Sequence, residues 1–409
     1  MHTSLIKLIN KYLFLLPIVL MAAIFLLNLH NLALFPLNRG FDADGHLEYI
    51  SYIRKNLRIP LANEGWELYQ TPLYYLINSI IGNPYLIRYF NLGFWSLFLV
   101  LSTIFFTKLF KDRLTGLIGA FFASSLPVVI YLLPTVSNEL FSGIMISLTI
   151  MYYVAEYGNG SKKNQIILGI LMGLSLLSKA TAFVLAISII TDQLLRNKLK
   201  INKTINKLII PLAIALAISG WFYIRNAIYF GNPFVTSVDF TKYSIHQSPG
   251  YRDLNFFVDF SGFIKFDLFR AHHYSLIPGT FFSWFFDGHN VIIPVQPYSK
   301  AGILLIISSL PIVLVIVRGI LFELKDRKNN IFFIYPIILF LSYIAYNFKL
   351  PFYSTVKGAF LVSGVIPFTY FFLKGLVNSR KYFIITNIYL VFYAILILRN
   401  FWILESWYK

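Results

Sequence analysis

The chain has 409 residues, of which 57% are hydrophobic and only 13% are charged, and its mean hydropathy is +0.69. Soluble domains carry about 25% charged residues, and disordered chains have low hydrophobicity. The composition therefore excludes both classes and predicts an all-α polytopic membrane protein. The absence of cysteine excludes disulfides and a thiol nucleophile.

Apolar runs of the length that crosses a bilayer recur along the chain. They predict about eleven transmembrane helices, at 13–34, 87–107, 115–133, 139–155, 165–179, 181–195, 208–224, 301–317, 331–346, 358–374 and 383–402.

The net charge of +18 has a simple explanation in the topology. With a cytoplasmic N-terminus, every predicted cytoplasmic loop is basic, as the positive-inside rule requires. The charge then needs no nucleic-acid partner, and the expected partner is the lipid bilayer. The richness in Ile, Asn and Lys suits a multi-pass protein of a prokaryotic plasma (inner) membrane, and an odd number of spans places the C-terminus outside.

Both long loops fall on the external face. We divide the chain into a membrane module at 1–235, which contains the first external loop at 35–86, a second external loop at 236–300, and C-terminal helices at 301–409. The second loop contains two Phe-rich stretches, Leu254–Phe263 and Phe281–Phe286, which predict segments at the membrane interface.

The first external loop concentrates acids in a chain that has few. Asp42, Asp44 and Glu48 flank His46, and the spacing from His46 onward predicts an amphipathic helix with His46, Ile50, Ile53 and Leu57 on one face. Two explanations fit the aspartates: helix capping, or carboxylates that abstract a proton or bind a cation.

The sequence Tyr69-Gln70-Thr71-Pro72 predicts the start of a second short helix, with Thr71 as its N-cap and Pro72 as its first residue. Charges beside the spans have structural explanations. Glu139 suits a helix N-terminus electrostatically, and Lys179 and Arg225 suit helix ends where basic side chains reach water. Cations could equally hold a phosphate group.

These features in order resemble the GT-C superfamily of polyprenyl-phosphate-sugar-dependent glycosyltransferases, closest to its family 39 branch of protein-O-mannosyltransferases and aminoarabinose transferases. Asp44-Gly-His46 is similar to the Asp-Glu-x-His motif of that branch, although Ala43 separates the two aspartates. Thr71 stands where the x-Pro-Pro-Leu motif has its first proline. Further similar segments are Ser137-Asn138-Glu139, Gly173–Lys179, Gly220–Pro233 and Lys357–Phe360.

The resemblance implies an inverting transfer of a sugar from a polyprenyl phosphate to an acceptor, which is a lipid-linked glycan, a polysaccharide or a protein, on the external face. It implies no cofactor and no metal. The implied site has Asp44 first and Asp42 second as the base, with Glu139 as a further acid. The implied phosphate-binding residues are Arg225, Lys357 and Lys179, and the implied positioning residues are His46, Glu48, Tyr69 and Gln70.

Other functions remain open at this point. A transporter or flippase of a lipid-linked saccharide would also place charges near the membrane, and a polysaccharide ligase or polymerase would use the same class of donor. His272-His273 and Asp287-Gly-His289 could indicate a metal, but adjacent His side chains diverge and no helix-spaced pair is present.

Overall fold

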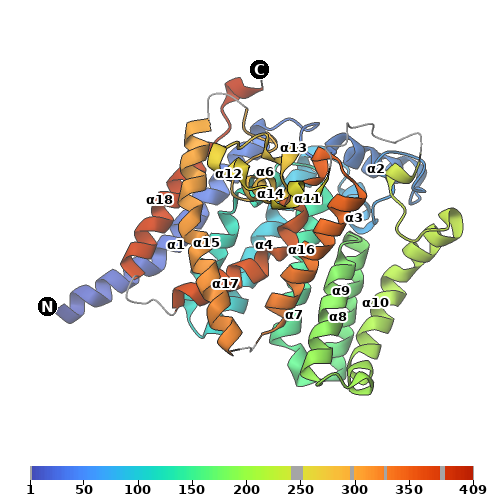
Figure 1. Ribbon diagram of the computed structural model, residues 1–409, viewed down its shortest axis with the longest axis horizontal. Helices are drawn as coiled ribbons and strands as arrows, with labels where there is room; N and C mark the ends of the chain where they lie inside the picture. The colour runs from blue at the N-terminus through green and yellow to red at the C-terminus, as the bar shows by residue number, and fades with distance from the viewer. Residues whose placement is uncertain (1, 241–251, 295–298, 327–328, 378–382, 409) are drawn as a thin grey trace.

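The computed structural model describes residues 2–240, 252–294, 299–326, 329–377 and 383–408, and these residues form helices without any strand. Figure 1 shows long helices packed side by side, with short helices gathered at one end. The helices of the bundle are α1 (His2–Leu34), α4 (Pro84–Phe110), α5 (Arg113–Ser124), α6 (Pro127–Leu132), α7 (Asn138–Ala155), α8 (Lys162–Ser178), α9 (Ala182–Arg196), α10 (Ile201–Phe230), α15 (Ser299–Asp326), α16 (Ile331–Lys349), α17 (Val365–Val377) and α18 (Phe383–Phe401).

The predicted class of a multi-pass helical membrane protein is supported. Six helical segments of the described chain are long and apolar enough to cross a membrane, namely Phe14–Leu34, Pro84–Phe110, Ile201–Phe230, Lys300–Asp326, Ile331–Lys349 and Tyr353–Val377. The other five predicted spans fall on helices that are shorter or less apolar, so the count of eleven spans remains a prediction. The predicted span 115–133 is broken between α5 and α6, where Leu126 takes an extended conformation before Pro127.

Close contact between helices is made at glycines. A side chain at Gly319 in α15 would collide with the backbone oxygen of Phe371 in α17, and one at Gly375 in α17 would collide with that of Val315. Small residues of this kind let membrane helices approach each other closely. One hydrophobic core, from Leu20 to Ile403, draws residues from all three predicted segments of the chain.

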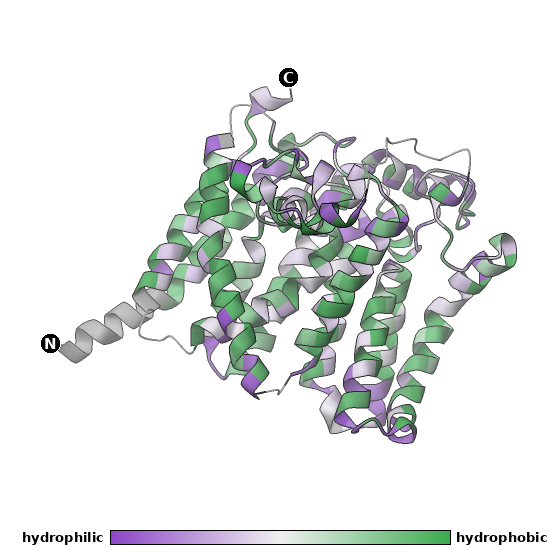
Figure 2. Cartoon of the chain, in the orientation of Figure 1, coloured by the Kyte–Doolittle hydropathy of each residue, from purple (hydrophilic) through white to green (hydrophobic). Residues whose placement is uncertain are grey.

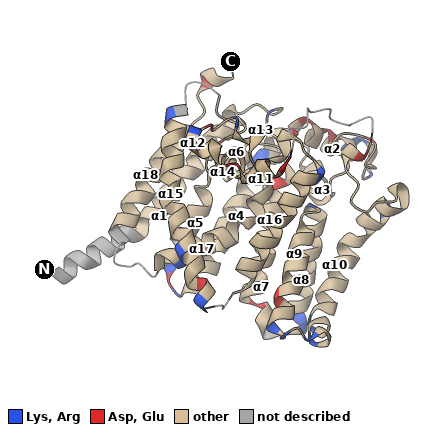
Figure 3. Cartoon of the chain, in the orientation of Figure 1, with Lys and Arg blue, Asp and Glu red and all other residues tan. Residues whose placement is uncertain are grey.

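Polar and charged residues lie mainly at the two ends of the bundle, with hydrophobic helices between them (Figures 2 and 3). One end carries the short helices of both long loops: α2 (Ala43–Asn56), α3 (Leu73–Ile81), α11 (Leu254–Val258), α12 (Ser261–Lys265), α13 (Ala271–Tyr274) and α14 (Leu276–Phe285). The C-terminal end of the chain lies there too, because the Tyr408 hydroxyl donates to the Ile292 carbonyl at 2.6 Å.

The amphipathic helix predicted at His46 is α2, and its buried face contains His46, Ile50 and Ile53 as expected. Leu57 is instead 89% exposed, because it ends the helix in a left-handed conformation with φ 50°. The predicted cap of α3 is wrong by one residue. The helix begins at Leu73 after Pro72, and the Thr71 hydroxyl makes no hydrogen bond to it.

The two Phe-rich stretches of the second loop differ. Leu254 and Val258 are exposed, as expected for a segment at a membrane interface. The prediction for Phe281–Phe286 is wrong, because Phe282, Phe285 and Phe286 are buried inside the protein in and after α14. Tyr131 of α6 fixes this helix by donating a hydrogen bond to the Ser283 carbonyl at 2.6 Å.

Candidate functional site

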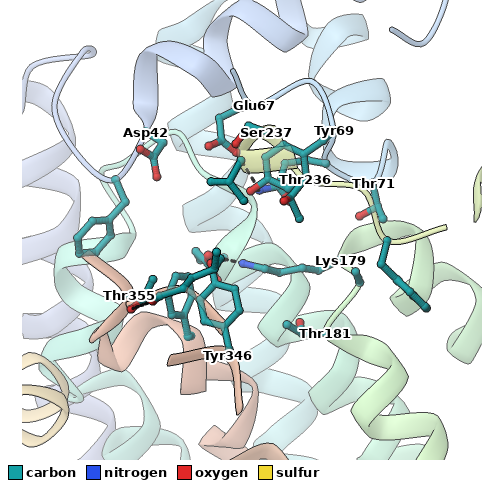
Figure 4. A pocket seen from close by; sticks show the side chains of 18 of the residues that line it. Asp42, Glu67, Tyr69, Thr71, Lys179, Thr181, Thr236, Ser237, Tyr346 and Thr355 are labelled. Carbon is teal, nitrogen blue, oxygen red and sulfur yellow. Dashed lines mark hydrogen bonds and ion pairs between the residues drawn. The ribbon is translucent and has the colours of Figure 1, made fainter. Parts of the chain in front are cut away.

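A cavity of about 660 Å³ lies at the end of the bundle that carries the short helices. Its lining comes from the first long loop, the start of α7, the end of α8, the segment after α10, and the segment between α16 and α17. Figure 4 shows Asp42 and Glu67 on one side of the cavity and Lys179 reaching in from another. Ligand pockets commonly have several hundred Å³ of this mixed lining, apolar with a few polar groups.

Asp42 lines the cavity and does not cap α2. Its backbone is left-handed, with φ 54° and ψ 29°, and its side chain makes no hydrogen bond to the helix that follows. Aspartate tolerates this conformation better than most residues, and residues held in it cluster at functional sites. The capping explanation therefore does not account for Asp42.

Asp44 and Glu48 do not line the cavity, and both are exposed. Successive residues of a helix turn by about 100°, so α2 directs Asp44 and Glu48 away from the face that carries His46. The geometry thus favours Asp42 over Asp44 as the candidate base, which reverses the order expected from the sequence, and it gives Glu48 no place in the site.

Lys357 brings a positive charge to Asp42 from a distant part of the chain. Its Nζ lies 4.0 Å from Asp42 Oδ2, and its side chain is only 8% exposed. The ammonium group also lies 4.1 Å from the ring centre of Phe41 and 5.4 Å from that of Phe360. A separation of 4.0 Å is longer than a direct hydrogen bond, so the carboxylate of Asp42 remains open to a ligand.

Lys179 and Glu139 form an ion pair in the cavity wall. Glu139 lies in the first turn of α7, and Lys179 follows the last residue of α8. The side chain of Lys179 is 11% exposed and that of Glu139 is 12% exposed. The Lys179 ammonium group also lies 5.4 Å from the ring centre of Phe360. Both lysine ammonium groups thus lie 5.4 Å from the ring centre of the same aromatic residue, Phe360.

Arg225, expected to bind the donor phosphate, does not line the cavity. Its guanidinium group donates to the Ile59 carbonyl at 3.4 Å and stacks over Phe222 at 4.9 Å. The residue connects α10 to the loop after α2. Its neighbour Asn226 lines the cavity instead.

Three of the expected positioning residues do line the cavity: His46, Tyr69 and Gln70. The His46 ring bonds the Tyr75 hydroxyl through Nδ1 at 2.7 Å. Burial lowers the pKa of His46 to about 4, against the opposing effect of Asp42, so the imidazole is neutral at pH 7. Gln70 donates to the Tyr69 hydroxyl at 3.0 Å and accepts from Asn138 at 3.2 Å.

Glu67 is a cavity residue that the sequence did not single out. It is 3% exposed, and its Oε2 accepts a hydrogen bond from Gln70 Nε2 at 2.8 Å. Burial, followed by the nearby charge of Asp42, raises the pKa of Glu67 to about 8. Its position four residues before Thr71, directly after Trp66, was the available signal, but a polar loop acid carries no periodic pattern.

The histidines of the second loop meet beside the cavity. His289 lines it and bonds the Val356 carbonyl through Nε2 at 2.6 Å, while the His272 ring lies 4.1 Å from the His289 ring. Burial, together with the nearby charge of Lys357, lowers the pKa of His289 to about 3. Asp287 serves the local backbone, because it accepts three backbone N–H groups, from Val291, Ile292 and Ile293. Across the described ranges, His, Asp and Glu side chains form no group of three that could hold a metal ion.

Comparison of the sequence with protein-family models finds no match, and comparison with curated proteins also finds none.

Proposed function

We propose that this chain is an inverting membrane glycosyltransferase that moves a sugar from a polyprenyl phosphate to an acceptor hydroxyl on the external face of the plasma membrane. The acceptor is a lipid-linked glycan, a polysaccharide or a protein. The observation that carries the proposal is the arrangement of Asp42, open and uncapped, in one cavity with two lysine ammonium groups. The ordered motifs that resemble the GT-C superfamily supply the reaction class.

In this reaction Asp42 takes the proton from the acceptor hydroxyl. The oxygen forms a bond to the anomeric carbon of the sugar, and the bond from that carbon to the phosphate oxygen breaks with its electron pair. Polyprenyl phosphate leaves. A positioned base contributes about 10²–10⁴-fold to such a rate, and fixed charges near a developing anion contribute at least as much.

Lys357 and Lys179 are the cations assigned to the leaving phosphate. Both line the cavity, and both are largely shielded from water, where a charge interacts more strongly than in bulk solvent. Each already balances a carboxylate, so the site holds its charges in place before the donor arrives. Arg225 is given no phosphate contact, because its guanidinium group faces Ile59 and Phe222.

The test uses the purified full chain in liposomes with radiolabelled polyprenyl phosphates that carry glucose, galactose, mannose or arabinose, and membrane extract as the source of acceptor. Transfer of label together with release of polyprenyl phosphate supports the proposal. Movement of the labelled lipid across the bilayer without transfer would instead identify a flippase and overturn it. Asp42→Asn and Asp44→Asn form the matched pair: transfer is lost in the first and kept in the second.

A further inference from the structure

Glu67 differs from the other two acids of the cavity in forming no ion pair with a described residue. Asp42 faces Lys357, and Glu139 pairs with Lys179. No ion pair to Glu67 occurs among the described residues. A buried carboxyl group without a cation is stable mainly as the neutral acid, because burial penalises the charged form.

The neutral form fits the charges that face Glu67. Asp42, from the start of α2, raises the pKa of Glu67 further, whereas Lys179, Lys357 and the hydrogen bond from Gln70 lower it, and the net result is about 8. Tyr69, Tyr75 and Tyr346 of α16 also interact electrostatically with Glu67, and His46 lines the same cavity. Burial lowers the pKa of His46 and raises the pKa values of Tyr69 and Tyr75, so these three groups are neutral at pH 7. Glu67 is thus a carboxylic acid at neutral pH.

The carboxyl group is held in one orientation. Gln70 Nε2 donates to Glu67 Oε2 at 2.8 Å, and Asn138 Nδ2 fixes the same amide by donating to Gln70 Oε1 at 3.2 Å. No partner of Glu67 Oε1 is found within the described part of the chain. Figure 4 shows the Glu67 carboxyl directed into the cavity, which Ser237 also lines.

Space for Glu67 is made by a glycine of α2. A Cβ atom on Gly45 would lie 2.6 Å from Glu67 Cγ and 3.3 Å from Trp66 Cδ1. Gly45 costs α2 about 1 kcal/mol relative to alanine, so its presence is explained by the close approach of the loop. The packing that surrounds Glu67 therefore favours one fixed position of this side chain.

We propose that Glu67 is a sugar-positioning residue, whose free Oε1 hydrogen-bonds one hydroxyl group of the sugar on the donor lipid and so selects donors that carry that hydroxyl. A neutral carboxylic acid can both donate and accept a hydrogen bond, which matches a hydroxyl group. A neutral acid also avoids repelling the donor phosphate in the same cavity. This role rests on the proposed function and adds to it the group that recognises the sugar.

The experiment measures binding of the labelled donor that wild type prefers, and of plain polyprenyl phosphate, to the full chain and to Glu67→Gln, Glu67→Ala and Glu48→Gln. Loss of one such hydrogen bond corresponds to about tenfold to hundredfold weaker binding. We expect that loss in Glu67→Ala for the sugar-bearing lipid alone, near wild-type binding in Glu67→Gln, and no change in Glu48→Gln, whose side chain is exposed outside the cavity.

A series of donors that each lack one sugar hydroxyl then locates the contact. The donor that lacks the hydroxyl contacted by Glu67 should bind wild type and Glu67→Ala equally. Wild-type binding of the full donor should weaken as pH rises through about 8, and binding to Glu67→Gln should not. The role would be overturned if Glu67→Ala weakened the binding of both lipids equally, or if Glu67→Gln lost binding above pH 8 to the same extent as wild type. If wild type binds no sugar-bearing lipid at all, it is the proposed function that fails.

Discussion

The two ends of the helix bundle both carry acidic residues (Figure 3), but Glu323 at one end and Asp42 at the other differ in burial and in their partners. At the end away from the cavity, Glu323 accepts the Tyr370 hydroxyl at 2.5 Å and the Asn329 backbone N–H at 2.9 Å, and pairs with Lys374 at 3.2 Å. At the cavity end, the Asp42 side chain is 45% exposed, and among the described residues its ion-pair partner is Lys357 at 4.0 Å. A carboxylate saturated with donors stabilises the fold, whereas one held open beside a cavity keeps its capacity for a ligand.

The strongest test of this comparison is Asp42→Asn. The amide keeps the size of the side chain but cannot take a proton at neutral pH, so transfer should fall by about two to four orders of magnitude while the protein stays folded. The donor-transfer assay in liposomes measures the rate, and unfolding in detergent checks the fold. Asp44→Asn should stay near wild type, and equal loss in both variants would show that the whole loop, rather than Asp42, matters.

Lys357→Gln should have the next largest effect. Loss of one fixed electrostatic group in an active site typically costs about 10²–10³ in rate, and Lys357 is the cation closest to Asp42. Lys349→Gln is the control, since that lysine ends α16 at the same end of the bundle but is exposed and lies outside the cavity lining. Similar transfer rates in Lys357→Gln and Lys349→Gln would show that Lys357 does not contribute to the reaction.

Glu323→Gln should affect stability rather than transfer. The substitution weakens three interactions of a buried carboxylate, which corresponds to about 1–3 kcal/mol in the free energy of unfolding. Unfolding by denaturant in detergent measures this change, and transfer per folded molecule should not move. Asp326→Asn, with a side chain 45% exposed, should cost at most about 1 kcal/mol. A specific loss of transfer in Glu323→Gln would contradict the distinction between the two ends.

A labelling experiment that leaves activity unchanged would assign the two ends to the two sides of the membrane. The chain has no cysteine, so single variants Lys55→Cys and Lys163→Cys can be read directly. Both positions are exposed, Lys55 in α2 at the end of the bundle that carries the cavity and Lys163 in α8 at the opposite end. A membrane-impermeant maleimide on intact cells should label Lys55→Cys alone, and the reverse pattern would place the cavity in the cytoplasm.

The sequence by itself determined the class of the protein, a multi-pass helical membrane protein, and the neighbourhood of the candidate site. In a membrane, the backbone N–H and C=O groups of a long apolar run must find their hydrogen bonds within the protein, which a helix provides. The helical period of α2 correctly put His46 on a buried face. The cavity residues Glu139 and Lys179 were also found, because acids and bases are costly near lipid and stand out in a chain with so few charges. Tyr69 and Gln70, which also line the cavity, were expected from the family resemblance.

Only the tertiary structure decided which of these groups meet. The choice between Asp42 and Asp44 depends on one left-handed residue and on Lys357, which lies far along the chain. Glu67 depends on the space left by Gly45 and on the partners that fix Gln70. Local sequence spacing limits which face of a helix a side chain can occupy. The protonation state and the partners of a carboxyl group depend on burial and on charges from distant parts of the chain. Burial and these charges come together only when the helices pack.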